Sequence, residues 1–183
     1  MIFGLFGARR KNAAVVDGLH EAVVEAARRP VFYAELGVPD TLEGRFDCVA
    51  LHATLVVRRL RALPDPASDL AQDFVDALFM NFDRALREIG VGDLAVPKRM
   101  KTMASAFLGR AKAYEAALAA DDATLAEALA RNVLGRTDVV PDEAFRLARW
   151  VRATVAAMDA VDFDVFEAGR PPFPELRETE ARS

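Results

Sequence analysis

Two histidines and one cysteine are the side chains best suited to bind a metal or to act as a nucleophile. His20, Cys48 and His52 lie on two different predicted helices, so they do not form a metal site of recognisable spacing. His20 is at the edge of an apolar stripe, and a histidine facing a helical bundle could ligate haem. His52 is expected to be half-buried with a backbone partner. A helical haem-binding protein or enzyme using His20 or His52 therefore stays open as the alternative function.

Serine and aspartate residues occur without the partners that catalysis requires. A serine nucleophile needs a base within reach and usually a sharp turn that exposes it, and neither Ser68 nor Ser105 has such a setting. The aspartates of the segment 66–90 share one solvated face, and the Glu-x-x-His pair of a carboxylate metal site is missing. The residues therefore predict a protein that is not an enzyme and has no cofactor.

The clearest functional candidate is a basic surface on a predicted helix over residues 97–119. At 100° per residue, three lysines project from the side opposite an apolar arc, and two arginines lie one above the other on a flank. These residues are Lys98, Lys101, Lys112, Arg99 and Arg110. The only acidic residue of this helix is Glu115. Two interpretations remain: an ordinary solvated face, or a docking surface for an acidic partner or for ribosomal RNA phosphates.

The elements that position these residues are predicted to be helices. Apolar residues recur every three or four positions rather than every two, and Gly and Pro separate the segments. We expect six main helices over residues 13–29, 40–63, 66–90, 97–119, 123–134 and 141–161, with short turns at 32–36 and 163–168. Helices 40–63 and 66–90 are predicted to be central. The predicted fold class is an all-α, single-domain bundle with no significant sheet.

Polar residues at the expected helix ends predict specific caps. Asp40, with Glu43 three residues later, is typical of a capping box for helix 40–63. Asp65 is expected to cap the next helix ahead of Pro66. Asp121 or Asp122 is expected to cap helix 123–134. Met80, on the polar side of helix 66–90, is expected to form an exposed apolar spot, as in a protein that contacts apolar clients.

Length, charge and cysteine content restrict the class of protein that this chain can be. The 183 residues suffice for one domain with a core, and the net charge of −4 argues against a sequence-specific nucleic-acid binder. One cysteine cannot form an internal disulfide, which favours a reducing compartment. No run of about 18 apolar residues occurs. We therefore expect a cytoplasmic protein, with the inner face of the cytoplasmic membrane as a place of action.

The two ends are predicted to lie outside a helical domain at residues 13–168. Residues 1–12 form an apolar and basic tail, in which Phe3, Leu5 and Phe6 could enter a membrane surface ahead of three basic residues. The other interpretation is a tail that packs on the core or stays loose. Residues 169–183 form a Pro-rich tail that is predicted to be mobile.

Four segments of this chain resemble the ubiquinol–cytochrome c chaperone family in order and spacing. They are FYAELGVPDTLEGRFD at residues 32–47, LHATLVVRRL at 51–60, the stretch 79–114 with its GVGDLAVPKRMKTMASAFLGR core, and ALARNVLG at 128–135. Together they cover most of the chain up to residue 135.

The resemblance implies a non-enzymatic assembly chaperone for the ubiquinol–cytochrome c reductase complex that binds newly made cytochrome b. It carries no catalytic residue over to this chain. Mitochondrial members work with a small partner protein and near the ribosomal tunnel exit, so the ribosome and such a partner are further expectations. The chain looks like a compact bacterial form, because no targeting extension is visible in its sequence.

Overall fold

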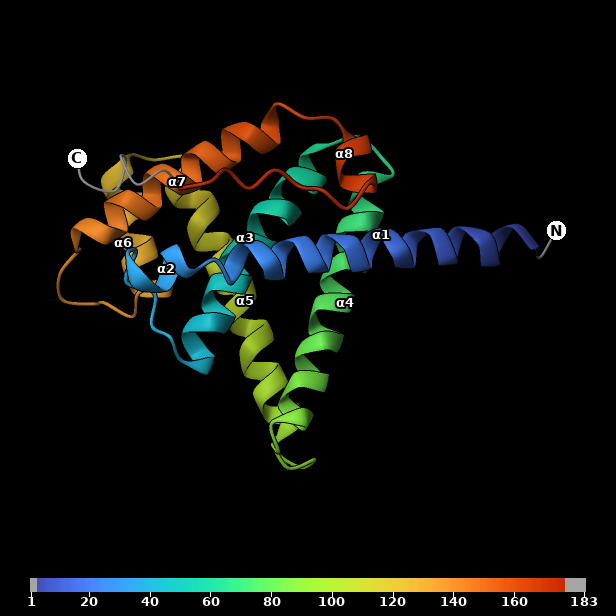
Figure 1. The fold of residues 1–183 in the computed structure, drawn as a ribbon, viewed down its shortest axis with the longest axis horizontal. Helices are drawn as coiled ribbons and strands as arrows, with labels where there is room; N and C mark the ends of the chain where they lie inside the picture. The colour runs from blue at the N-terminus through green and yellow to red at the C-terminus, as the bar shows by residue number, and fades with distance from the viewer. Residues whose placement is uncertain (1–2, 177–183) are drawn as a thin grey trace.

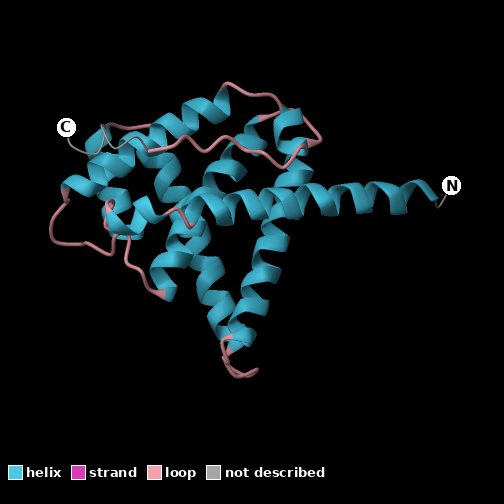
Figure 2. Ribbon diagram, in the orientation of Figure 1, coloured by secondary structure: helices cyan, strands magenta, loops and turns pink. Residues whose placement is uncertain are grey.

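The protein is an all-α bundle in its computed structural model, which describes residues 3–176 and the side chains of residues 13–176 (Figure 1). Within those residues no strand occurs, so the predicted fold class is confirmed (Figure 2). The helices are α1 (Phe3–Ala27), α2 (Pro30–Ala34), α3 (Leu42–Ala62), α4 (Ala67–Glu88), α5 (Val96–Leu118), α6 (Asp122–Asn132), α7 (Asp142–Asp159) and α8 (Phe163–Glu167).

Helix α3 is the central element of the bundle. Every residue from Ala50 to Val57 is buried, and α3 contacts α1, α4, α5 and α7. Helix α4, which was also predicted to be central, contacts α1, α3 and α5 but is covered on one side only. Its apolar stripe, which includes Phe74 and Leu78, is buried, while aspartates such as Asp69 and Asp73 are exposed along the opposite side. A helix with one charged face belongs at the surface of a bundle.

Two of the three cap predictions need correction. The side chain of Thr41, not Asp40, accepts the hydrogen bond from the Gly44 N–H at the start of α3. Asp40 instead binds Arg45, at 2.7 Å. No side chain caps α4, because the Asp65 carboxylate accepts a hydrogen bond from the Ser68 hydroxyl. The third prediction is confirmed, since Asp121 accepts from the Thr124 N–H at the start of α6.

The first helix begins earlier than the pattern predicted. Helix α1 starts at Phe3 rather than at residue 13, and its amino-terminal part extends beyond the rest of the bundle (Figure 1). The stretch from Ala8 to Ala14 consists largely of strong helix formers and holds no residue that stops a helix, which accounts for the extension. The predicted lipid contact of Phe3, Leu5 and Phe6 depends on side chains outside the described set.

The first part of the predicted carboxy-terminal tail is packed on the bundle. After α8, the chain runs back along α7 as an extended segment (Figure 1). The Trp150 indole N–H donates to the Pro174 carbonyl at 3.0 Å, and an Arg29 guanidinium N–H lies 3.1 Å from the Phe173 carbonyl oxygen. These bonds attach residues 170–176 to the bundle, so a loose tail beginning at residue 169 is not what the structure shows. Residues 177–183 lie outside the described part.

Helices α4 and α5 form a hairpin that projects from the bundle. Their ends farthest from α3 converge on the loop at residues 89–95, which forms a tip away from the other helices (Figures 1 and 2). Gly90 ends α4 with a φ of 84°, a left-handed conformation that favours glycine. The first turns of α5, which hold Lys98, Arg99 and Lys101, lie next to this tip.

Candidate docking surface

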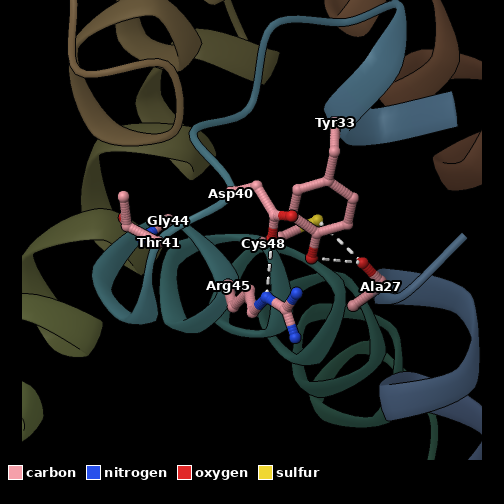
Figure 3. Close-up of polar contacts among 7 residues, drawn as sticks. All are labelled: Ala27, Tyr33, Asp40, Thr41, Gly44, Arg45 and Cys48. Carbon is pink, nitrogen blue, oxygen red and sulfur yellow. Dashed lines mark hydrogen bonds and ion pairs between the residues drawn. The ribbon is translucent and has the colours of Figure 1, made fainter. Parts of the chain in front are cut away.

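The polar cluster closest to a reactive arrangement is the junction of α1, α2 and α3 (Figure 3). The Tyr33 hydroxyl and the Cys48 thiol both donate to the Ala27 carbonyl oxygen, at 2.8 and 3.4 Å. Burial raises the pKa of Cys48 to about 12, so the thiol stays protonated at neutral pH. Burial likewise raises the pKa of Tyr33. These groups join three helices and are not set up as nucleophiles.

His52 is fully buried rather than half-buried as predicted. Its Nδ1 lies 2.8 Å from the Cys48 carbonyl oxygen, which confirms the expected backbone partner and places the ring proton on that nitrogen. The rings of Phe32, Trp150 and Phe173 surround it at centroid distances of 4.9 to 5.1 Å. Burial lowers the pKa of His52 to about 4, so the ring is neutral at physiological pH.

Neither histidine stands in a setting that favours the haem alternative. Aromatic rings fill the space beside His52 that the plane of a haem would need. His20 is half-buried on α1, and burial is the main cause that lowers its pKa. Among the side chains that the structure describes, no three or more His, Cys, Asp or Glu residues are grouped so that they could hold a metal ion.

The exposed side of α5 carries the predicted lysine face. Lys98, Lys101 and Lys112 are exposed, and Leu108, with 65% of its surface accessible, lies on the same side of the helix. No acidic residue occurs from Ala95 to Tyr114, and the exposed Glu115 follows one turn after Lys112. The face is therefore positive from Lys98 to Lys112. Arg99 is also exposed at the start of the helix. Lys98, Lys101 and Lys112 therefore share an accessible face, and Arg99 is exposed on the flank of the helix.

Arg110 does not belong to that surface. Its Nη2 lies 2.7 Å from Asp47 Oδ1 on α3, and its Nε–H donates to the Asn132 carbonyl at the end of α6. The guanidinium also lies over the Phe46 ring, 5.7 Å from the centroid. Only 17% of the Arg110 side chain is accessible. Because α3 and α6 flank this side of α5, Arg110 holds three helices together and is not available to a partner.

The sequence analysis missed two exposed apolar residues at the hairpin tip. Leu94 is 99% accessible and Ile89 is 56% accessible. Met80 is 70% accessible, as predicted, and lies among the exposed aspartates of α4. The signal for Leu94 was present as a leucine three residues before Pro97, inside the turn between two helices, where no helical face can bury it.

The described helices are too short or too polar to cross a lipid bilayer.

A family model described as ubiquinol-cytochrome C chaperone matches residues 34–173 of this chain. The chain belongs to this chaperone family. The match contains α3 to α8, and thus the hairpin and the basic face. It begins after α1 and ends within the extended segment that covers His52.

Individual relatives agree with the family assignment. Over 166 residues the chaperone is 24% identical to the ubiquinol-cytochrome-c reductase complex assembly factor 1 of Xenopus laevis, covering 90% of this chain and 83% of that protein. Over 108 residues it is 32% identical to the mitochondrial protein CBP3 of Saccharomyces cerevisiae, covering 57% of this chain and 32% of that protein. The chaperone thus spans about a third of the yeast protein.

A solved structure shows the same fold at full length. The crystal structure of the Cbp3 homolog from Brucella abortus superposes with a TM-score of 0.83 at 37% identity, covering 96% of this chain and 97% of that chain. The arrangement of helices described above is therefore that of an experimentally determined family member.

Proposed function

We propose that this chain is a non-enzymatic assembly chaperone for the ubiquinol–cytochrome c reductase complex and that it binds newly made cytochrome b. The observation that carries the proposal is the family match over residues 34–173, supported by the Xenopus relative, whose name is that of an assembly factor for this complex. The full burial of Cys48 and His52 supports binding without turnover, because neither side chain is accessible to a substrate.

The proposed contact surface is the exposed face of α5, which consists of Lys98, Arg99, Lys101 and Lys112. The positive charge that α5 carries from Lys98 to Lys112 attracts an acidic partner and orients it during encounter. Leu108 supplies an apolar spot within that face, 65% accessible, for the desolvated centre of a contact. A small partner protein and ribosomal RNA near the tunnel exit are further candidates for this face.

The place of action that we propose is the inner face of the cytoplasmic membrane. Cytochrome b is a membrane protein, so a chaperone that receives it during synthesis must work where the client enters the bilayer. The proposed α5 contact would then orient the chaperone beside its client.

A deletion strain tests the function. Loss of the gene should lower assembled cytochrome b while leaving its transcript unchanged. Restoration by a plasmid copy is the control for effects on neighbouring genes. Normal amounts of cytochrome b in the deletion strain would show that the proposed function is wrong.

A charge-reversal variant tests the surface. Lys98→Glu, Lys101→Glu and Lys112→Glu together should keep the fold, because all three side chains are exposed. The variant should recover at least tenfold less cytochrome b in a crosslinking pull-down. A matched control carries the same charge change at Arg28, Arg61 and Arg136, which are exposed on other elements. Equal recovery by the two variants would remove the α5 face from the proposal.

A further inference from the structure

The tip of the α4–α5 hairpin combines an apolar end with a positively charged stem. Leu94 and Ile89 are the apolar side chains, 99% and 56% accessible, and they lie in the loop that is farthest from the bundle on this side (Figure 1). Scattered single leucines are normal on a protein surface. Two exposed apolar residues, five positions apart at the projecting end of one helical hairpin, differ from that background.

Hydrogen bonds within the loop hold the tip in shape. The Val91 N–H donates to the Leu86 carbonyl at 3.0 Å, and the Gly90 N–H donates to the Arg87 carbonyl at 3.0 Å. The Ala95 N–H donates to the Gly92 carbonyl at 2.8 Å, directly before α5 begins. Val96, two residues after Leu94, is fully buried. The turn that exposes Leu94 is therefore ordered. Burial of this side chain in a partner would cost little further backbone entropy.

The stem next to the tip is positive although the whole chain is negative. Lys98, Arg99 and Lys101 are exposed in the first turns of α5. The stretch 80–102 contains five basic and three acidic residues, whereas the chain as a whole has a net charge of −4. This asymmetry concentrates positive charge at one end of the molecule.

Two of the three acidic residues near the tip are paired with a cation. Arg87 Nε lies 2.7 Å from Asp83 Oδ2, and Arg87 Nη1 lies 2.6 Å from Asp93 Oδ1. Glu88 is the third acidic residue, at the end of α4. Because one guanidinium serves both aspartates, the lysines of α5 remain the dominant charge that an approaching anionic surface meets.

We propose that the tip of the α4–α5 hairpin is a membrane-docking element that inserts Leu94 and Ile89 into the surface of an anionic lipid bilayer. The two side chains would enter the boundary between headgroups and acyl chains, and Lys98, Arg99 and Lys101 would meet lipid phosphates. The charge complementarity favours anionic lipid over an apolar protein segment as the occupant. This inference goes beyond the proposed client contact and would hold whatever the client is.

Flotation of the full-length protein with lipid vesicles tests the proposal. The vesicles are pure phosphatidylcholine, or phosphatidylcholine with 30 mol% phosphatidylglycerol. We expect binding to the anionic vesicles only, and weaker binding as salt is raised. The variant Ile89→Ser with Leu94→Ser should bind at least tenfold more weakly, because each lost side chain is worth about tenfold or more on burial. Lys98→Gln with Lys101→Gln should also bind at least tenfold more weakly, at roughly fivefold per charge.

A matched control separates insertion from a general loss of apolar surface. Leu42→Ser with Val139→Ser removes two exposed apolar side chains, 49% and 67% accessible, outside the α4–α5 hairpin. This control should bind vesicles like the original protein. Circular dichroism melting curves establish that each variant is folded, which is expected because every changed side chain is exposed.

Several outcomes would overturn the proposal. They are equal binding by the tip variant and the control, equal binding to both kinds of vesicle, and absence of binding to anionic vesicles at low salt. Binding that survives the tip changes but is lost in Phe3→Ser with Phe6→Ser would assign the lipid contact to the amino-terminal segment instead. Cytochrome b recovery in the deletion and pull-down experiments does not enter this test, so the two proposals can fail separately.

Discussion

The Cα of Gly44 faces the carbonyl oxygen of Pro39 so closely that a Cβ built on Gly44 would lie 2.0 Å from that oxygen. Real Cβ atoms do not approach a backbone atom at that distance, and neither backbone can move without shifting the start of α3. Gly44 is buried in the first turn of α3, and its backbone N–H donates a hydrogen bond to the Thr41 hydroxyl oxygen. The contact fixes how the loop before α3 crosses the helix.

Gly44→Ala should therefore destabilise the protein strongly. We expect a loss of at least about 3 kcal/mol in the free energy of unfolding, at the upper end of what overpacking costs. Urea unfolding followed by circular dichroism measures it. Gly109→Ala is the matched control, because a Cβ at Gly109 would meet no atom within 4 Å. That substitution in the middle of α5 should raise the free energy of unfolding by about 0.5–1 kcal/mol. Similar effects of both substitutions would contradict the proposed clash.

The ion pair between Arg110 and Asp47 should make stability depend on pH in a specific way. Burial raises the pKa of Asp47 to about 6, outweighing the attraction of Arg110. Arg110→Met removes that attraction and raises this pKa further, so at pH 8 ionised Asp47 destabilises the variant more than the original protein. We expect a loss of about 2 kcal/mol at pH 8, below the cost of breaking a fully buried pair. The loss should be smaller at pH 5, where the carboxyl holds its proton.

Chemical denaturation at the two pH values measures this difference. Adding Asp47→Asn to the Arg110→Met variant is the control, since it removes the titrating group and should abolish the dependence. An equal loss at pH 5 and pH 8 in the single variant would show that Asp47 is not the group responsible.

Neutral His52 should make the protein acid-sensitive. Because burial lowers the pKa of His52 from 6.5 to about 4, the unfolded chain binds its proton first as the pH falls. The stability that neutral His52 contributes is complete above pH 6.5 and is lost as the pH falls toward 4, by an amount on the order of 3 kcal/mol. His52→Leu removes the titrating ring and should flatten this part of the curve. Asp47 has a raised pKa and therefore makes the protein more stable as the pH falls. Because Asp47 is present in both proteins, this effect cancels in the comparison. If the free energy of unfolding changes with pH in the same way in both proteins, His52 is not the group that causes the acid sensitivity.

The extended segment after α8 should contribute to stability through Phe173. This ring packs on His52, and its neighbour Pro174 accepts the Trp150 N–H. Phe173→Ala should lower the free energy of unfolding by about 2 kcal/mol, less than for a fully buried phenylalanine. Phe145→Ala on the exposed side of α7 should change it by no more than about 0.5 kcal/mol. Equal effects in thermal or urea unfolding would mean that the segment is not anchored as described.

Helical periodicity was sufficient to predict the fold class and most helix positions. The stripes around Phe74 on α4 and Phe107 on α5 are buried, as the spacing indicated. Periodicity identifies a buried face because a helix returns to the same side every 3.6 residues. The same reasoning placed Lys98 and Lys101 on the exposed side of α5 correctly.

Tertiary structure alone decided which of these residues a partner could reach. Arg110 and Lys112 are two residues apart on one helix, yet α3 and α6 cover the first and leave the second exposed. Leu94 and Phe173 show the converse: an apolar residue in a turn is exposed at the tip, while one in a presumed tail packs on the core. Exposure outside a regular helix depends on which distant segments pack there, and helical periodicity carries no information about that.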